Sequence, residues 1–375
     1  LLALLLALPG QAGATEDLSD YVYPIEDPFE ATVSGTPVEL RHRFIKSKSM
    51  QRDNFELEVF PGRELPPLFD SVRSLAFSLA YQDVPAPLLF VIAGTGGSYR
   101  SSSSKYLQRV FYQAGFHVIT LSSPSSHEFI AAASGSRYPG ISEEDASDLY
   151  RVMQMALAQV RDQIVVTDVY LTGYSLGGLH AAFVSHLDEQ EQAIGFRKVL
   201  LLNPPVSLYT SALLLDRLVG REAGMQDAHA YFSRLYGKFA EYFSEHGMIR
   251  LDDEAFMFKF QESEQSLTRE ELMALIGASI RLPAAGLVVT VDALNGTGQV
   301  AERDRELPLG TPLDPYFNRG HWWRFTDYLD RLLLPYWQAR QPESEREQLI
   351  GRIGLPALRD YLETSSKIGV ISNAD

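Results

Sequence analysis

A serine flanked by glycines lies between a predicted strand and a predicted helix, and this arrangement constrains the fold more than any other feature of the sequence. Residues 165–172 are mostly apolar and β-branched, and residues 173–178 read Gly-Tyr-Ser-Leu-Gly-Gly. Apolar side chains then recur every four residues over 176–189, the spacing of one helix face. A strand that passes into a helix through so short a turn holds the serine in a strained conformation, and the flanking glycines avoid clashes between a Cβ atom and neighbouring backbone.

Apolar runs alternate with helical patterns through the first half of the chain. Strands are predicted over 55–60, 75–81, 87–92, 116–121, 164–172 and 199–202, and helices over 106–115, 143–163 and 176–189. Continuous apolar strands separated by helices are typical of βαβ units, which build a parallel sheet covered on both faces. We therefore expect an α/β fold with a doubly wound, mostly parallel sheet.

The second half of the chain has a different pattern. Residues 206–365 are mostly helical in pattern and rich in Leu, Tyr and Phe, whereas residues 366–375 return to a strand pattern. We expect a core over 15–205, a large helical cap inserted over 206–365, and a return strand of the core over 366–375. A sheet strand followed by no further element suggests a sequence cut at that end.

The N-terminal residues resemble a secretion signal. Residues 1–9 are apolar but too short to cross a bilayer, and Ala12-Gly13-Ala14 offers small residues for cleavage after Ala14. Residues 1–14 are therefore predicted to be a signal peptide whose basic n-region is missing. The prediction implies an exported protein, either periplasmic or secreted. The alternative interpretation is a buried strand or helix end. No later uninterrupted apolar run reaches about 18 residues, so no stable membrane anchor is expected.

Charge and cysteine content exclude several classes of function. The chain has 375 residues, with 33 Lys and Arg against 48 Asp and Glu, which gives a formal net charge of −15. Phosphate backbones require a basic surface, so nucleic acid is not an expected partner. The absence of cysteine excludes thiolate nucleophiles, disulfides and zinc–thiolate sites. No HExxH motif or acidic calcium loop is present either, so neither a metal nor a cofactor is expected.

On these motifs the sequence resembles the α/β-hydrolase superfamily. The resemblance covers about residues 55–205 and returns near 367, and it implies that Ser175 is the nucleophile of a serine hydrolase. Residues 93–97, Ala-Gly-Thr-Gly-Gly, follow the predicted strand where the family places its oxyanion loop, with Ala93 in place of the usual histidine. Matching Gly94 to the family glycine makes the N–H groups of Thr95 and Leu176 the oxyanion donors, with Gly96 and Gly97 completing the loop.

The family order of Ser, acid and His leaves two pairings open. Asp375 follows the last predicted strand and is the preferred acid, with its histidine partner expected beyond residue 375. Alternatively, residues 286–291 form a strand that ends at Asp292, with His321 as the base; Asp314 with His321 is a weaker variant. The same segment also fits a helix interrupted by Pro283. The other histidines weighed, at positions 117, 127 and 180, are expected to be structural or on the surface.

The resemblance implies hydrolysis of a small-molecule acyl substrate, most simply a carboxylic ester, through an acyl-enzyme on Ser175. An acyltransferase, a peptidase, or a non-catalytic binding protein on the same scaffold are the alternatives. Two other segments each have two possible roles. The polar loop 98–105 is either a solvated loop or a contact for a polar part of the substrate. The aromatic residues of the cap form a core or line an acyl-binding surface.

Overall fold

The chain folds into two compact units. The computed structural model describes residues 23–37, 40, 42, 44, 49–218, 228–246, 256–303, 307–320 and 323–373. One unit comprises the described residues within 1–41 and 227–272, and the other comprises those within 42–226 and 273–375. The larger unit contains the whole sheet. The expected signal peptide over residues 1–14 lies outside the described residues.

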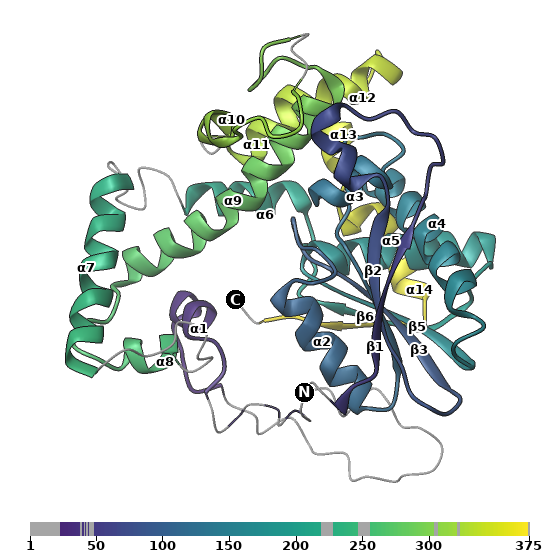
Figure 1. Ribbon diagram of the computed structural model, residues 1–375, viewed down its shortest axis with the longest axis horizontal. Helices are drawn as coiled ribbons and strands as arrows, with labels where there is room; N and C mark the ends of the chain where they lie inside the picture. Colours follow the sequence, from purple (N-terminus) through teal and green to yellow (C-terminus); the bar gives the residue numbers. More distant parts are fainter. Residues whose placement is uncertain are drawn as a thin grey trace. The chain divides into compact units, whose positions relative to one another are not determined.

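The larger unit is built on a seven-stranded sheet in the order β1-β2-β4-β3-β5-β6-β7 (Figure 1). β1 is antiparallel to β2 and β2 to β4, while all other neighbours are parallel. The predicted doubly wound, mostly parallel sheet is therefore confirmed. The strands are β1 (Arg52–Leu57), β2 (Leu75–Ala80), β3 (Ala86–Ile92), β4 (His117–Leu121), β5 (Val166–Tyr174), β6 (Phe196–Leu202) and β7 (Ile368–Ile371).

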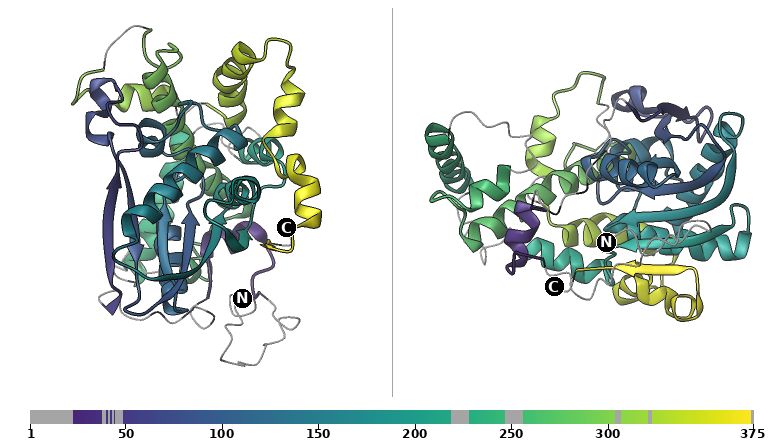
Figure 2. Two further views of the ribbon diagram at one scale, coloured as in Figure 1. Left: turned by 90° about the vertical axis from the view of Figure 1, so that its right-hand side faces the viewer. Right: turned by 90° about the horizontal axis from the view of Figure 1, so that it is seen from below.

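Helices cover both faces of this sheet (Figures 1 and 2). The crossover from β3 to β4 runs one way along the sheet, whereas those from β4 to β5 and from β5 to β6 run the other way. Because such crossovers are right-handed, α2 (Ser102–Gln113) covers one face, and α4 (Ser142–Val160) and α5 (Leu176–Glu191) cover the other. The chain thus reverses direction beside β3, and the carboxyl ends of β3 and β5 lie side by side there, which is where open α/β sheets bind ligands.

Two hydrophobic clusters hold the larger unit together. The first joins the sheet to α4 and α5, and it includes the fully buried rings of Phe77, Phe90 and Phe129. The second joins the helices after β6 to one another and to short segments before α4, with Trp323, Tyr328 and Trp337 among its members. The helices of the larger unit that follow β6 are α6 (Leu208–Arg217), α9 (Arg269–Asn295), α10 (Asp314–Gly320), α11 (Phe325–Tyr328), the π-helical turn η6 (Leu329–Leu333), α12 (Leu334–Arg340), α13 (Arg346–Arg352), the 3₁₀ turn η7 (Leu355–Leu358) and α14 (Arg359–Thr364).

The helical region is therefore divided differently from the single cap expected over 206–365. Residues 273–365 belong to the unit that contains the sheet, and the described residues within 227–272 belong to the other. The physical reason is the second hydrophobic cluster, because its apolar side chains from α9 onward pack against segments that precede α4, such as Ile130 and Ile141. Helical periodicity shows which face of a helix is apolar but not which partner covers it.

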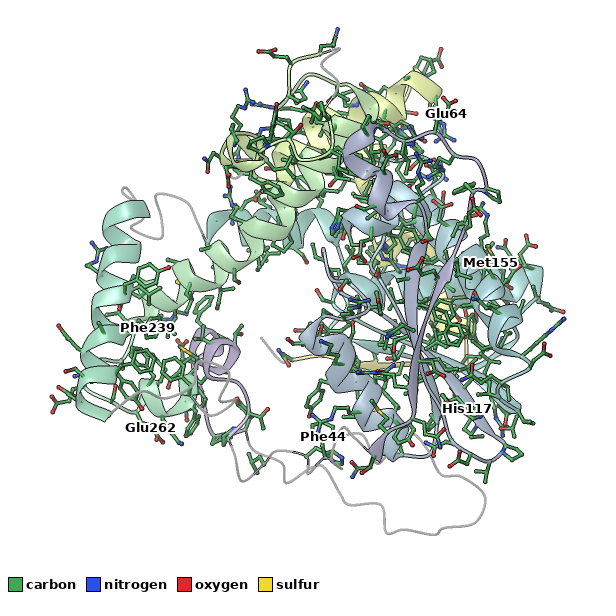
Figure 3. All side chains as sticks on the ribbon, in the orientation of Figure 1. Phe44, Glu64, His117, Met155, Phe239 and Glu262 are labelled. Carbon is green, nitrogen blue, oxygen red and sulfur yellow. The ribbon has the colours of Figure 1, made fainter. Side chains whose placement is uncertain are left out.

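The smaller unit contains α1 (Pro28–Ser34), α7 (Ala228–His246), α8 (Phe256–Gln261) and the first turn of α9. Its core is aromatic: the rings of Phe239 and Phe260 lie 4.7 Å apart, and those of Tyr242 and Phe260 lie 5.2 Å apart (Figure 3). Ion pairs at its surface join Lys238 to Glu271 at 2.6 Å and Arg269 to Asp27 at 2.8 Å. These rings form the core of this unit. A core was one of the two interpretations given for the aromatic residues in the sequence analysis, the other being an acyl-binding surface.

α9 is the one helix in the described part of the chain that is long and apolar enough to cross a membrane. The sequence-based expectation excluded such a segment because charged and proline residues interrupt its apolar runs. In the structure, 59% of its most apolar window is buried inside the protein. Leu287, Val288 and Val291 of this helix lie in the second hydrophobic cluster, as the side chains of a core helix do.

His117 is a buried histidine at the start of β4 (Figure 3). The backbone N–H of Gln82 donates to its Nδ1 at 3.1 Å, and its Nε2 lies 3.2 Å from the carbonyl oxygen of Val165. The ring is therefore neutral, with its proton on Nε2. Burial lowers the pKa of His117 below its ordinary value, and the hydrogen bond to Val165 offsets only part of this effect. The residue has the structural role expected from the sequence.

This lowered pKa predicts a loss of stability in acid. Below about pH 6.5 the histidine is protonated in the unfolded chain but stays neutral in the folded chain. The contribution of His117 to the free energy of unfolding is therefore fully present above that pH and is lost as the pH falls. We expect His117→Gln to flatten the fall of the unfolding midpoint between about pH 8 and about pH 5. His127→Gln, which removes an exposed histidine, is the matched control. An unchanged slope in His117→Gln would contradict the assignment.

Candidate active site

Ser175 occupies the turn between β5 and α5. Its backbone has φ 54° and ψ −122°, a left-handed conformation that is strained for a residue with a side chain. Two sets of hydrogen bonds hold it there. Its N–H donates to the carbonyl oxygen of Leu202 at 2.8 Å, and its carbonyl oxygen accepts from Gly178 at 2.8 Å and Leu179 at 3.2 Å. The predicted strand–turn–helix is thus present, with Ser175 at its tip.

Glycines allow this turn because neighbouring backbone leaves no space for a side chain. A Cβ atom on Gly173 would lie 2.1 Å from the carbonyl oxygen of Gly177, and one on Gly177 would lie 2.3 Å from that of Ile92. Both distances are far below van der Waals contact. The first turn of α5 therefore packs directly on the ends of β3 and β5.

The loop after β3 lies against the same turn. A Cβ atom on Gly94 would lie 3.2 Å from the carbonyl oxygen of Tyr174 and 3.5 Å from the Cβ of Ser175. Gly96 has φ +64°, and a Cβ atom there would lie 2.6 Å from the Cβ of Pro283 in α9. The loop closes on itself through a hydrogen bond from the N–H of Gly97 to the carbonyl oxygen of Gly94 at 2.9 Å.

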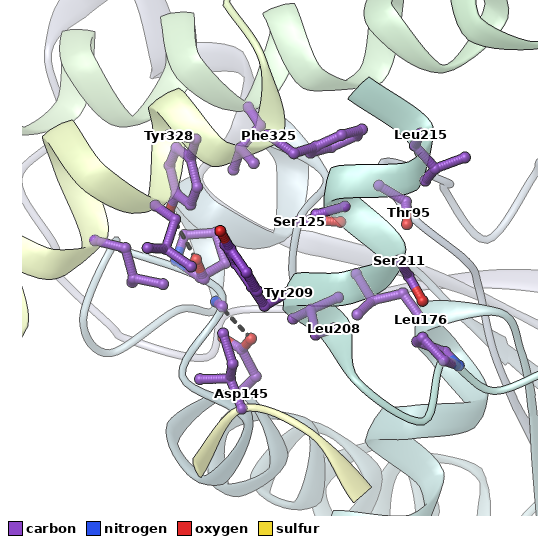
Figure 4. Close-up of a pocket in the computed structure, with 18 of the residues that line it drawn as sticks. Thr95, Ser125, Asp145, Leu176, Leu208, Tyr209, Ser211, Leu215, Phe325 and Tyr328 are labelled. Atoms are coloured by element: carbon purple, nitrogen blue, oxygen red, sulfur yellow. Dashed lines mark hydrogen bonds between the residues drawn. The ribbon is translucent and has the colours of Figure 1, made fainter. Parts of the chain in front are cut away.

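Two backbone amides beside Ser175 have no acceptor in the part of the chain that the structure describes. Among the described residues, neither the N–H of Thr95 nor the N–H of Leu176 donates a hydrogen bond. Thr95, Ser175 and Leu176 line one pocket, and Figure 4 shows Thr95 and Leu176 at it. Leu176 is the first residue of α5, where the positive end of the helix dipole adds to the attraction for an anion. The arrangement suits a negatively charged oxygen bound next to the hydroxyl of Ser175.

Ser125 is a site residue that the sequence analysis missed. Its Oγ accepts a hydrogen bond from the N–H of Gly96 at 2.8 Å and lies 2.9 Å from the Oγ of Ser123. Only 6% of Ser125 is exposed, and it lines the same pocket as Ser175. The signal was available, because the sequence Ser-Ser-Pro-Ser-Ser begins directly after a predicted strand, and the carboxyl ends of parallel strands meet at one edge of the sheet.

The rest of the pocket is mostly apolar and formed largely by the helices after β6. Its volume is about 120 Å³. Side chains from α6, α9, α11 and η6 contribute to its lining, and Figure 4 shows those of Leu208, Leu215 and Phe325. The apolar lining residues are Leu208, Ala212, Leu215, Leu287, Phe325, Leu329, Leu333 and Ile353. Such a wall favours an uncharged, hydrophobic part of a ligand.

Asp145 and His180 form a buried pair near the pocket. Nε2 of His180 lies 3.4 Å from Oδ2 of Asp145, and the same oxygen accepts from the N–H of Gly140 at 2.8 Å. Asp145 lines the pocket but His180 does not, and Nδ1 of His180 has no hydrogen-bond partner among the described residues. Among the described residues, no histidine lines this pocket.

The preferred acid and the alternative base lie outside the described residues. These are Asp375 and His321. β7 nevertheless runs parallel to β6, with Ile371 paired to Leu202, whose carbonyl oxygen accepts from the N–H of Ser175. The chain after β7 therefore leaves the sheet at the edge where Ser175 lies, which keeps Asp375 as a prediction.

Asp292 has a different role from the acid considered in the sequence analysis. The strand predicted over 286–291 is wrong, because these residues lie inside α9. The carboxylate of Asp292 accepts the N–H groups of Gln299, Val300 and Ala301 at 2.8–3.0 Å, and the hydroxyl of Thr297. It thus holds the loop after α9. Asp314, the acid of the weaker variant, is exposed at the start of α10.

The Asp292→Asn substitution tests this structural role. Asparagine replaces an accepting oxygen by an NH₂ group, so buried amides lose their acceptor and the free energy of unfolding should fall by about 1–3 kcal/mol. The rate at which a fluorophosphonate modifies Ser175 should stay the same in folded protein. Asp314→Asn is the exposed control and should change neither quantity. Loss of modification in stable Asp292→Asn protein would restore the catalytic interpretation.

Metal binding has no support in the described part of the chain. No group of three or more His, Asp or Glu side chains is arranged there to hold a metal ion.

Comparisons with known proteins show similarity in structure only. No protein-family model and no curated protein sequence matches the chain. Among solved structures, it is similar to Est1E from Butyrivibrio proteoclasticus, with 16% identity and a TM-score of 0.27 over 39% of this chain and 52% of that one. An acylaminoacyl peptidase from Pyrococcus horikoshii has 16% identity and a TM-score of 0.32 over 44% of this chain and 24% of that one. A lipase/esterase from Lactobacillus plantarum has 16% identity and a TM-score of 0.30 over 43% and 63%.

The alignment thus spans about half the length of the first structure and a quarter of the second. The assignment of the fold rests on three features of the structure: the strand order, the antiparallel β2 and the strand–turn–helix at Ser175. These are the features of the α/β-hydrolase fold.

Proposed function

We propose that this protein is a serine hydrolase that cleaves a carboxylic ester through an acyl-enzyme on Ser175. One observation carries the proposal: a serine held at positive φ shares a pocket with two backbone amides that have no acceptor among the described residues. Turns and capping serines are common in proteins, but a strained turn is retained only where surrounding structure enforces it, and such sites are often functional.

The proposed reaction begins with attack of Ser175 Oγ on the carbonyl carbon of the substrate. The carbonyl oxygen becomes negatively charged and accepts the N–H groups of Thr95 and Leu176; loss of one such donor typically costs about 3 kcal/mol of transition-state stabilisation. The proton of Ser175 passes to a histidine base and from it to the leaving alkoxide. Water then attacks the acyl carbon, its proton passes through the histidine to Ser175 Oγ, and the acyl group leaves as the carboxylic acid.

The acid and base of this reaction remain proposals. Asp375 is the preferred acid, with a histidine partner predicted after it, and His321 is the alternative base. An acid positioned in this way fixes the tautomer of the histidine and stabilises its charged form. The apolar pocket wall supports an ester of an uncharged acyl group as the substrate.

A binding protein without catalytic activity is the second candidate. It is favoured by one observation, namely that no histidine among the described residues lines the pocket. In this case Ser175 and the two amides would hold a ligand oxygen without activation of the serine.

Reaction with a fluorophosphonate probe separates the two candidates. We expect stoichiometric labelling of the complete protein at Ser175, read by intact mass and peptide mapping, because the probe requires an activated serine and an oxyanion site. Ser175→Ala should abolish it, while Ser211→Ala, which removes another pocket serine, should not. An unlabelled but folded wild-type protein would favour the binding protein, and labelling elsewhere would contradict the assignment of Ser175.

Ser125 provides a test of the oxyanion loop. Ser125→Ala removes the acceptor for the N–H of Gly96, so the loop that carries Thr95 should lose its fixed position. We expect kcat for ester hydrolysis to fall about ten-fold, or about 1.4 kcal/mol, with little change in KM. Ser125→Thr keeps the hydroxyl and should recover most of the rate. A change in KM alone, or no recovery with threonine, would argue against this positioning role.

A further inference from the structure

A second pocket lies beside α2, at a site that shares no lining residue with the pocket at Ser175. β1, β2, the loop before α2 and α2 itself each contribute side chains to it. Its volume is about 290 Å³, enough for about ten water molecules. The loop and the start of α2 belong to the polar segment 98–105, for which the sequence left a binding role open.

Three positive charges surround this pocket. Arg52 comes from β1, Arg100 from the loop and Lys105 from α2, and all three are exposed. Among the described residues, none of them forms an ion pair with a carboxylate. Other exposed arginines, such as Arg319 and Arg359, also lack an ion pair among the described residues, but these three charges gather at one pocket of a chain whose net charge is −15. Arginines elsewhere that pair with acids include Arg151, Arg197, Arg324, Arg340, Arg346 and Arg352.

Arg100 is also oriented by its neighbour. Its Nε donates to the hydroxyl of Tyr99, and its guanidinium carbon lies 4.8 Å from the centre of the Tyr99 ring. Tyr99 is itself buried, with its N–H donating to Ser122 at 3.0 Å. A guanidinium held in this way loses little conformational freedom when it binds an anion, and its other N–H groups stay available.

The floor of the pocket is polar although it is buried. Ser78 is 4% exposed and Gln108 is 2% exposed, and Gln108 Nε2 donates to Ser78 Oγ at 3.3 Å. Asn54 lies opposite Ser78 on the adjacent strand and also lines the pocket. Buried polar side chains cost stability unless they find partners, and the long Gln108–Ser78 hydrogen bond is a weak one. A polar ligand would supply better partners.

We propose that this pocket binds a phosphate-bearing ligand. Three unneutralised positive charges around hydrogen-bond donors suit an anion with several oxygens and more than one negative charge, which a phosphate provides and a single carboxylate does not. The acidic residue next along the same face of β1, Glu56, accepts from Ser74 and does not line the pocket. The site is independent of the proposed reaction at Ser175.

Calorimetric titration of the complete protein with inorganic pyrophosphate tests the proposal. We expect saturable binding that weakens as salt is added, because the charges are exposed to solvent. Arg100→Gln and Lys105→Gln should each weaken binding about ten-fold, and Lys105→Arg should retain it. Arg359→Gln, which removes an exposed arginine on α14, is the matched control.

Three outcomes would overturn the proposal: no saturable binding at low salt, an equal loss in Arg359→Gln, or full binding in both pocket variants. Lys105 and Arg100 are exposed, so these variants should fold, and their melting curves will confirm it.

A second experiment compares the binding of the protein to vesicles of phosphatidylcholine with and without phosphatidic acid. Binding to pyrophosphate alone indicates a soluble ligand, whereas additional binding to phosphatidic acid that Arg100→Gln removes indicates a lipid headgroup. Labelling of Ser175 by the fluorophosphonate should be the same in every variant, so failure here leaves the proposed hydrolase untouched.

Discussion

The structure of the site depends on the close contact between Gly177 and the carbonyl oxygen of Ile92. A side chain at position 177 would overlap that oxygen, with only 2.3 Å from its Cβ atom. α5 therefore begins directly on the end of β3, and Ser175 between β5 and α5 is forced to positive φ. The same contact brings the loop after β3 to the serine. One packing constraint thus places the hydroxyl, the amide of Leu176 and the amide of Thr95 in a single pocket.

A second constraint ties the helices after β6 to this arrangement. Gly96 of the loop packs on Pro283, and a Cβ atom on Gly96 would overlap the proline ring. Beyond Pro283, α9 continues into the second hydrophobic cluster, which also contains Tyr328 and Leu333 of the pocket wall. The loop that carries one candidate oxyanion donor is therefore held from one side by the sheet and from the other by a helix that forms the apolar wall.

The sheet was predictable because each of its strands carries a local signal, either a continuous apolar run or an alternation, and because the glycines around Ser175 have a steric cause. The helix over 269–295 was harder, since residues 286–291, Gly-Leu-Val-Val-Thr-Val, are apolar and β-branched like a buried strand. They are helical because Leu287, Val288 and Val291 are buried among other helices, and this tertiary packing outweighs their intrinsic preference. Ser125 was missed for a related reason: its role depends on a contact with Gly96, 29 residues earlier in the chain.

Buried aspartates in this chain serve as acceptors for backbone amides. Asp188 accepts the N–H groups of Ile194, Gly195 and Phe196 and the hydroxyl of Tyr150. Burial alone would raise the pKa of Asp188, but these hydrogen bonds lower it below its ordinary value.

Asp216 shows the same use close to the pocket. Its carboxylate accepts from the N–H groups of Phe325 and Thr326, and so links α6 to α11, two helices of the pocket wall. Asp292 accepts four hydrogen bonds, one for each lone pair of its carboxylate, which leaves none with which to orient a histidine. Both Asp292 and Asp216 are buried in the larger unit, and in the structure both bind backbone amides of that unit. The chain after β7 leaves the sheet at the edge where Ser175 lies, and for this reason Asp375 stays the preferred acid of the proposed reaction.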